Sequence, residues 1–225
     1  MNLNYRYEIK FIEDVAGLSN IMQWIYCTTS ANKVYKDRVV NSIYFDDTSF
    51  SSVKDNLGGI AQRRKLRLRW YGDNEISVPN FEEKIKNGRL GYKKSYQLNS
   101  IKNSLFKNNL EKISYDCQKE LLDHNVIFDN HITPTLLVKY KREYFQTYDG
   151  IRITIDQNIQ FSEIQLYSKI NDLKTFSHEG SILEIKFDQS QKEKVAQLIR
   201  PLHSTPKRHS KYLIGLAKLG QVVYL

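Results

Sequence analysis

The stretch that decides the fold is AQRRKLRLRWYG, residues 61–72, in which basic and apolar residues alternate. Side chains of a β-strand point alternately to opposite faces, so residue parity assigns each side chain to a face. The odd-numbered positions form a basic row: Arg63, Lys65, Arg67 and Arg69. The even-numbered positions form a mostly apolar row: Arg64, Leu66, Leu68 and Trp70. The segment therefore predicts a strand that packs through one face and is strongly cationic on the other.

Polar rows of the same kind recur in four more segments with apolar backs. Their members are Arg6, Glu8 and Lys10; Glu82, Lys84 and Lys86; Arg152, Thr154 and Asp156; and Glu184 and Lys186. An antiparallel sheet could show all these rows to solvent as one flat surface. A sheet curled into a barrel would instead point them inward, where water or an anionic ligand must fill the lumen. Glu8, Glu82 and Glu184 would then act as internal counterions, or hold a divalent metal that bridges to phosphate oxygens.

Turn signals divide the chain into hairpins. Asn87-Gly88 follows a predicted strand over residues 81–86, and Asp149-Gly150 separates predicted strands over residues 135–147 and 151–159. Further strands are predicted over residues 5–11, 39–47 and 181–188. Amphipathic spacing predicts helices over residues 14–27, 100–123 (with one break), 190–203 and 210–219. We expect one α+β domain over residues 1–225, with roughly eight mostly antiparallel strands.

The charge balance points to an anionic partner. Lys and Arg total 34 against 25 Asp and Glu, a formal net charge of +9. The two cysteines, Cys27 and Cys117, offer neither a disulfide framework nor a metal motif. Residues 1–11 do not resemble a signal peptide, and no apolar run approaches the roughly 20 residues that span a bilayer. The sequence therefore predicts a soluble cytoplasmic protein without a membrane segment.

Other function classes have weaker support. Nucleic acid would suit basic strands with interleaved aromatics, but Trp70, Tyr92 and Tyr96 lie opposite the cationic rows by parity, which favours core packing over base stacking. No recognition-helix, zinc-finger or RNA-recognition signature is present, so we expect no nucleic acid partner. The five histidines lack metal-ligand spacing, and there is no phosphate-binding glycine loop or local Ser-His-Asp signal.

Taken in order, the segments resemble a known family. They are YEIKF, VNSIYFDD, KLRLRWYG, FEEKIKNGRLGYKKSY, LLVKYKREYF, IRITIDQNI, LEIKFD and RHSKYLIGL. This order is similar to that of the VTC (vacuolar transporter chaperone) domain, the polyphosphate-polymerase branch of the triphosphate tunnel metalloenzymes. The resemblance covers nearly the whole chain. It implies an antiparallel β-barrel with flanking helices, whose tunnel binds ATP and a growing polyphosphate chain, assisted by Mn²⁺ or Mg²⁺.

The resemblance and the parity of the strands together assign site residues. Those expected to act in catalysis are Arg67, Arg69, Lys84, Arg142 and Lys211. Those expected to bind substrate are Lys10, Lys65, Lys93, Tyr140, Arg152, Lys186 and Ser210. Those expected to bind the metal are Glu184 and Glu8. Lys94 lies beside Lys93, and a shift of one residue would exchange their faces.

Three activities stay open at this point. Where the triphosphatase and cyclase branch begins with Glu-x-Glu-x-Lys, this chain has Arg6 in place of the first glutamate, which favours a polymerase over a hydrolase of triphosphate or polyphosphate. A noncatalytic receptor for polyphosphate or inositol phosphates could use the same basic tunnel. The retained Glu184 argues against pure binding, because a receptor has less need of a metal ligand. The partner domain and membrane segments of the eukaryotic complexes are not found, so coupled export is not expected.

Overall fold

The computed structural model describes residues 6–73, 76–88, 90–128, 130–202 and 204–223. Its strands are β1 (Tyr7–Glu13), β2 (Asn32–Asp47), β3 (Gln62–Tyr71), β4 (Asn80–Asn87), β5 (Leu90–Gln97), β6 (Ile132–Gln146), β7 (Arg152–Glu163), β8 (Thr175–His178) and β9 (Ser181–Phe187). Its α-helices are α1 (Val15–Thr28), α2 (Ser51–Leu57), α3 (Leu110–Asp123), α4 (Lys192–Leu198) and α5 (Lys211–Lys218). The α+β class is confirmed, with nine strands in the described residues rather than about eight.

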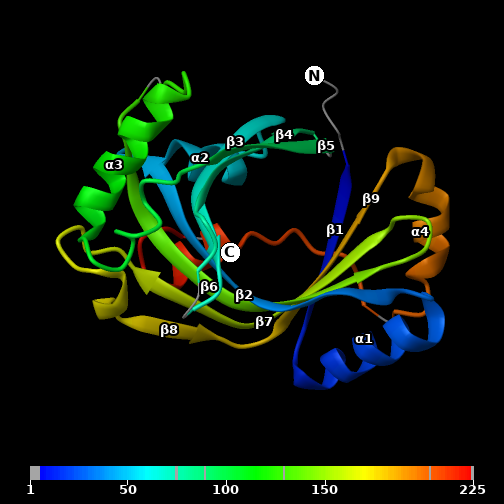
Figure 1. Cartoon of the computed structure of the whole chain (residues 1–225). Coiled ribbons are helices and arrows are strands. Elements are labelled where there is room, and N and C mark those ends of the chain that lie inside the picture. Colours follow the sequence, from blue (N-terminus) through cyan, green and yellow to red (C-terminus); the bar gives the residue numbers. More distant parts are fainter. Residues whose placement is uncertain (1–5, 74–75, 89, 129, 203, 224–225) are drawn as a thin grey trace.

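The strands form one antiparallel sheet in the order β1-β9-β7-β6-β2-β3-β4-β5, and β8 pairs with β7 beyond the end of β9. Figure 1 shows that the sheet curls until β1 and β5, the strands at its two edges, come together. The edges share one isolated bridge, in which the Arg6 amide donates to the Gly91 carbonyl at 3.3 Å. The expected closed barrel is therefore a strongly curled sheet with an open seam. β1 pairs with β9 along its whole length and meets β5 only where it begins.

Both predicted hairpins are present. β4 and β5 join at Asn87-Gly88 and β6 and β7 at Asp149-Gly150, where Gly88 has φ +61° and Gly150 φ +86°, a region in which a Cβ is strained. The acidic turn after β2 starts α2, because an Asp47 carboxylate oxygen accepts from the amides of Ser49 and Ser51 at 3.0 Å.

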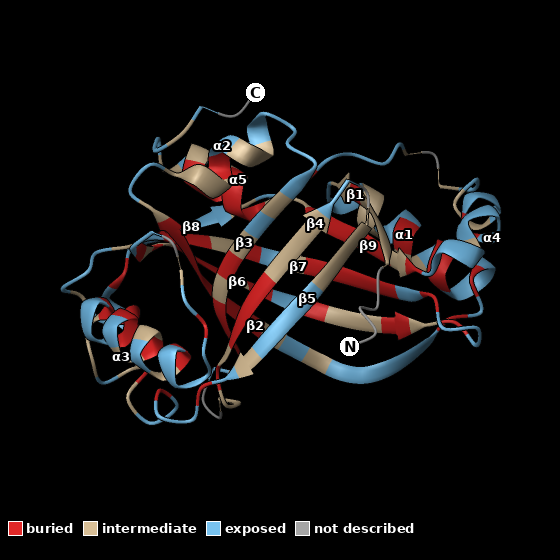
Figure 2. Cartoon of the chain, turned by 90° about the horizontal axis from the view of Figure 1, so that it is seen from above, coloured by how far each residue is buried: buried red, intermediate tan, exposed pale blue. Residues whose placement is uncertain are grey.

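The outer face of the sheet is covered by helices at two places. α3 packs through Ile113, Cys117 and Leu121 against a cluster that contains Leu68 and Trp70 of β3. α1 packs through a second set of apolar residues, including Trp24, against β6, β7 and β9. Figure 2 shows α3 and α1 at opposite ends of the molecule, with the middle strands buried and β5 largely exposed. Both helices therefore pack on the apolar backs of the strands and leave the polar fronts facing inward.

Helix α5 lies on the inner face instead. Tyr212, Leu213 and Leu216 of this helix are buried against Leu136 and Phe161 of the sheet. α5 fills part of the space inside the curled sheet, so its first turn ends next to the polar rows. Ser210 caps this turn, its hydroxyl accepting from the Leu213 amide at 3.4 Å.

Some helix boundaries differ from the expected ones. α3 begins only at Leu110, because the Asn109 side chain accepts from the Lys112 amide at 2.9 Å and fixes the start there, while most of residues 100–107 form turns. α4 covers residues 192–198 rather than 190–203.

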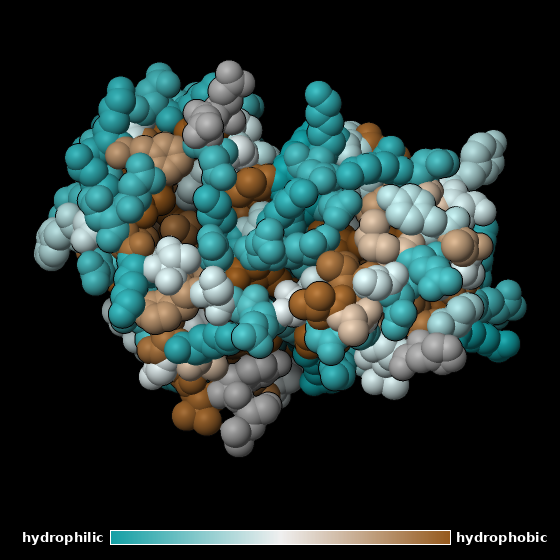
Figure 3. Space-filling model, turned by 90° about the horizontal axis from the view of Figure 1, so that it is seen from below, coloured by the Kyte–Doolittle hydropathy of each residue, from teal (hydrophilic) through white to brown (hydrophobic). Residues whose placement is uncertain are grey.

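None of the described helices has both the length and the apolar character needed to cross a membrane. The face in Figure 3 carries several separate hydrophobic groups set among hydrophilic side chains.

Candidate functional site

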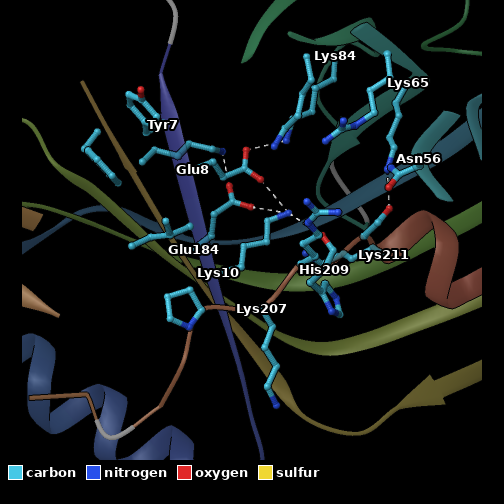
Figure 4. A pocket seen from close by; sticks show the side chains of 18 of the residues that line it. Tyr7, Glu8, Lys10, Asn56, Lys65, Lys84, Glu184, Lys207, His209 and Lys211 are labelled. Carbon is cyan, nitrogen blue, oxygen red and sulfur yellow. Dashed lines mark hydrogen bonds and ion pairs between the residues drawn. The ribbon is translucent and has the colours of Figure 1, made fainter. Parts of the chain in front are cut away.

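A cavity of about 750 Å³ lies inside the curled sheet, between the inner faces of its strands and the segment that leads into α5. Among its described lining residues, cationic side chains far outnumber the two carboxylates, Glu8 and Glu184. Figure 4 shows these carboxylates side by side on one wall, with Lys84 and Lys65 reaching in from the opposite wall. The segment before α5 is fixed to β1 because the Lys207 amide donates to the Lys10 carbonyl at 2.8 Å.

Most of the residues predicted from sequence meet in this cavity. Those that line it are Glu8, Lys10, Lys65, Arg67, Arg69, Lys84, Tyr140, Arg142, Glu184, Lys186, Ser210 and Lys211. Two predicted residues do not line it. Arg152 is exposed at the first position of β7, and Lys93 lies on edge strand β5. Lys93 rather than Lys94 faces the cavity side, because it pairs with Lys84 whereas Lys94 pairs with Glu83.

Glu8 and Glu184 share the Lys10 ammonium. Lys10 Nζ lies 2.9 Å from Glu8 Oε1 and 3.4 Å from Glu184 Oε2, and Lys84 Nζ lies 2.7 Å from Glu8 Oε2. Lys186 Nζ also contacts Glu184 Oε1. Burial and the neighbouring Glu184 raise the pKa of Glu8, but the surrounding lysines outweigh them and hold that pKa well below its ordinary value. Burial also raises the pKa of Glu184, but Lys186, Lys10 and Lys84 outweigh it and hold that pKa well below its ordinary value, so both carboxylates are ionised at neutral pH.

A third carboxylate, Glu82, lies behind the arginines of β3. Glu82 Oε2 accepts from Arg67 Nε at 2.7 Å, and Lys93 Nζ donates to Glu82 Oε1 at 2.6 Å. Burial raises the pKa of Glu82, but the arginines and Lys93 lower it further than burial raises it. Arg69 Nη1 lies 3.7 Å from Glu82 Oε2. Neutral groups also hold Arg69, its Nε donating to Ser42 Oγ at 3.0 Å and its Nη2 to Tyr140 Oη at 3.1 Å. These contacts set the direction of both guanidinium groups before any ligand binds.

A fourth carboxylate, Asp156, is fully buried beneath the cavity. It accepts from Arg142 Nε at 2.5 Å and from another Arg142 nitrogen at 2.7 Å, and Lys211 Nζ donates to it as well. Burial raises the pKa of Asp156, but Arg142 and Lys211 lower it to about 2. The Lys211 ammonium and the Arg142 guanidinium also lie 4.6 and 5.2 Å from the Tyr140 ring centroid.

Two further lysines of the cavity, Lys65 and Lys84, carry positive charge that nearby carboxylates do not balance. Among the described residues, Lys65 Nζ donates only to the neutral Ser210 hydroxyl, at 2.7 Å. Burial together with nearby Lys10 and Lys84 holds the pKa of Lys65 well below its ordinary value. The pKa of Lys84 falls from 10.5 to about 7, because burial and the other lysines outweigh its contact with Glu8. The cavity therefore holds more positive charge than its own carboxylates neutralise, which favours binding of a polyanion.

Comparison with known families agrees with this arrangement. The VTC domain family matches residues 5–220. The chain belongs to the VTC domain family. The resemblance inferred from the sequence is thereby confirmed, and the match includes every strand and helix described above.

Solved structures of other proteins share the fold of this VTC domain. The PH1819 protein of Pyrococcus horikoshii OT3 has a TM-score of 0.54 at 16% identity, covering 95% of this chain and 99% of that chain. A putative adenylate cyclase of Vibrio parahaemolyticus has a TM-score of 0.54 at 10% identity, covering 92% and 97%. The putative adenylyl cyclase HpAC1 of Hippeastrum has a TM-score of 0.54 at 9% identity, covering 97% of each chain. At these identities the likeness concerns the fold.

The carboxylates of this VTC domain fit a hard divalent cation. Glu8 and Glu184 both contact the Lys10 ammonium, and the nearby Glu184 raises the pKa of Glu8, as a close carboxylate does. Mg²⁺ is commonly bound by one or two carboxylates together with phosphate oxygens. The described residues hold no group of three or more side chains that could bind a metal by themselves. A metal at Glu8 and Glu184 would thus need further oxygen ligands, from water or a bound phosphate.

Several cavity residues of the VTC domain escaped the sequence reading. Asp156 stood in a polar row, but nothing in the sequence showed that it would pair with Arg142 and Lys211. Tyr44 lines the cavity beside Arg67, and its hydroxyl accepts from that guanidinium at 3.4 Å. Further basic and histidine side chains of the lining that were not predicted are Arg63, Lys86, Lys192, Lys207, Arg208 and His209. Parity could have found Arg63 and Lys86, which belong to the polar rows of β3 and β4.

Proposed function

We propose that this VTC domain is a phosphotransferase that moves the γ-phosphoryl group of ATP onto a growing polyphosphate chain. The observation that supports this most is the excess of inward-facing cations, because such a site is stable only with a polyanion or water in it. The activity would place the protein where ATP is abundant, such as the cytoplasm.

In this proposal the protein contributes position and charge. Phosphoryl transfer through a loose transition state depends mainly on alignment and electrostatic stabilisation, not on a protein nucleophile. Arg67, Arg69 and Arg142 are already oriented by Glu82, Tyr140 and Asp156, so they can hold phosphate oxygens with little reorganisation. The groups that would contact the remaining phosphates are Lys10, Lys65, Lys84, Lys186, Ser210 and Lys211.

Glu184 and Glu8 would hold Mn²⁺ or Mg²⁺ against the phosphates. When bound, such a metal neutralises charge on bridging phosphate oxygens. The lysines that now neutralise these carboxylates, Lys10 and Lys84, would then be released to contact phosphate. The ammonium groups of Lys10 and Lys84 would thus pair with the carboxylates in the free site and with phosphate in the metal-bound site.

The transfer itself exchanges one P–O bond for another. A terminal oxygen of the polyphosphate chain forms a bond to the γ-phosphorus of ATP while the bond from that phosphorus to the β,γ-bridging oxygen breaks. ADP leaves with the electron pair of that bond, and the chain grows by one phosphate. The attacking and leaving oxygens must lie in line, so the two phosphate chains would meet end to end in the cavity.

Hydrolysis is a second candidate, because water could attack at the same position. The neighbour from Hippeastrum is described as having a dominant triphosphatase activity, and its fold is similar to this one. Against hydrolysis, Arg6 occupies the place where that branch carries its first glutamate. A binding protein without turnover would use the cavity but would have no need of Glu184.

Product analysis distinguishes these activities. Purified protein would be incubated with ATP and Mn²⁺ while ADP, free phosphate and long-chain polyphosphate are measured in the same samples. The proposal predicts ADP and polymer in matching amounts with little free phosphate. Free phosphate without polymer would replace it with a triphosphatase. No turnover with retained ATP binding would replace it with a receptor.

A further inference from the structure

A cluster of three tyrosines surrounds one arginine outside the cavity described above. The Arg38 guanidinium carbon lies 5.3 Å from the ring centroid of Tyr35, 5.8 Å from that of Tyr71 and 5.9 Å from that of Tyr144. The rings of Tyr35 and Tyr144 meet edge to face at 5.7 Å. Within the described part of the chain, Arg38 has no hydrogen-bond acceptor and no carboxylate partner. Its five N–H donors are thus held in place by aromatic rings and left unused.

This cluster continues the inner face of the sheet. Arg38 is directly opposite Arg142 in the β2–β6 ladder, and residues directly opposite each other point to the same face. Tyr144 is two positions beyond Arg142 on β6, and Tyr71 is two positions beyond Arg69 on β3, so both share the face of those arginines. On β3 and β6 the Arg38 cluster (Arg38, Tyr35, Tyr71 and Tyr144) therefore begins one inward-facing residue beyond the cavity.

A groove opens at this cluster. Arg38 and Tyr71 line it with Gly72, Ile76 and Ser77, and Lys102 and Asn103 complete its lining. The side chains of Lys102 and Asn103 have no hydrogen-bond partner in the described residues. The groove thus combines an aromatic ring, a flat guanidinium and several unused donors. A flat, conjugated ring with hydrogen-bond acceptors on its edge matches all three features, because it can stack on the planar groups and accept from the donors.

The distance suits a nucleotide whose phosphates enter the cavity. Arg38 and Ser42 are four residues apart on β2, and Ser42 is opposite Arg69 and accepts its hydrogen bond. Four residues of strand span about 13 Å. A nucleoside triphosphate extends over a comparable length from its base to its γ-phosphate. A base at Arg38 would therefore leave the γ-phosphate near Arg69.

We propose that the groove at Arg38 binds the purine base of the nucleotide, with the base stacked on Tyr71 and the Arg38 guanidinium. This deepens the proposed function and rests on it, because it makes the cavity a phosphate site with a nucleoside end. Stacking tolerates different bases, so the groove favours nucleoside triphosphates over bare phosphate chains without selecting strongly between adenine and guanine.

Calorimetric titrations with ATP and with inorganic tripolyphosphate test this. Arg38→Ala should weaken ATP binding by about tenfold, the scale of one lost stacking contact, and leave tripolyphosphate binding unchanged. Arg38→Lys should behave as Arg38→Ala does, because lysine keeps the positive charge but lacks the planar guanidinium on which a base could stack. Arg64→Ala is the matched control, since Arg64 lies 5.5 Å from the Phe128 ring centroid on the outer face and should affect neither ligand.

Three results would overturn the proposal. Equal weakening of ATP and tripolyphosphate in Arg38→Ala would make the groove a phosphate site. Unchanged ATP binding in Arg38→Ala, or in Arg38→Lys, would show that no base stacks there, while tripolyphosphate binding to the wild type would leave the cavity assignment standing. Binding of neither ligand to the wild type would overturn the cavity assignment and the groove together.

Discussion

Lys84 links phosphate binding to pH. Its pKa of about 7 means that above neutral pH the free site holds Lys84 mostly as the neutral amine. A bound triphosphate favours the ammonium, so binding at pH 8 should take up a proton and weaken as pH rises. Calorimetry in two buffers of different ionisation enthalpy measures this uptake. Lys84→Arg, which stays charged, should lower the uptake by about one proton, and the same uptake in that variant would contradict the assignment.

Glu184 should influence binding and turnover in opposite directions. Its carboxylate is buried among cations that must also hold phosphate, so Glu184→Gln removes a negative charge from the cavity. Without metal, tripolyphosphate should bind this variant several-fold more tightly, while metal-dependent turnover of ATP should be lost. Titration without metal and an ADP assay with Mn²⁺ give the two readouts. Glu111→Gln, at an exposed position of α3, is the control, and weaker metal-free binding by Glu184→Gln would contradict this role.

For single residues, the sequence predicts which face of a strand a side chain occupies, because side chains alternate between the two faces. Parity placed Arg67 and Lys84 in the cavity, because a fixed side-chain period leaves no other choice once the apolar face is buried. Parity says nothing about where a strand leaves the cavity, so Arg152 shares the polar row of β7 but is exposed at its end. Asp156 was not predicted as a site residue, because its partner Lys211 is 55 residues away.

Helix α5 depends on close contact with the sheet. A Cβ on Gly215 would lie 2.5 Å from Leu136 Cδ2 and 2.7 Å from Phe161 Cδ1, and both of those side chains are fully buried. Gly215→Val should therefore lower the free energy of unfolding by about 3 kcal/mol. Because α5 carries Lys211 into the cavity, tripolyphosphate binding should weaken as well.

Urea unfolding and calorimetry measure these two effects. Lys218→Val places the same side chain at an exposed position of α5 and should change neither quantity. A Gly215→Val variant with the wild-type unfolding midpoint would mean that α5 does not pack on β6 and β7 as described.

Elements with strong local signals were predicted, and those that depend on tertiary contacts were not. The hairpins at Gly88 and Gly150 follow from turn chemistry that sequence displays directly. Residues 32–38 are largely polar and exposed, so their share of β2 is set by pairing with β6, which sequence does not show. β8 is four residues long and exists because it pairs with β7. The open seam between β1 and β5 likewise depends on how far the sheet curls.

Because the molecule carries a large positive charge, bound anions should stabilise its folded state. The net charge is +9, and much of the positive charge points into one cavity. A ligand that binds only the folded state raises its stability in proportion to ln(1 + [L]/Kd). Tripolyphosphate should therefore raise the midpoint of thermal unfolding by several degrees, well beyond NaCl at equal ionic strength. Differential scanning calorimetry measures both, and equal shifts would mean that general screening, not a specific site, accounts for the effect.

We expect the cavity inside the curled sheet to hold a phosphate chain with a metal at Glu8 and Glu184. The most direct measurement is a crystal structure with tripolyphosphate and Mn²⁺, with anomalous scattering used to locate manganese. We expect phosphates against Arg67, Arg69 and Arg142, and a manganese peak beside Glu184. Phosphate bound only on the outer surface, or manganese far from Glu8 and Glu184, would contradict it.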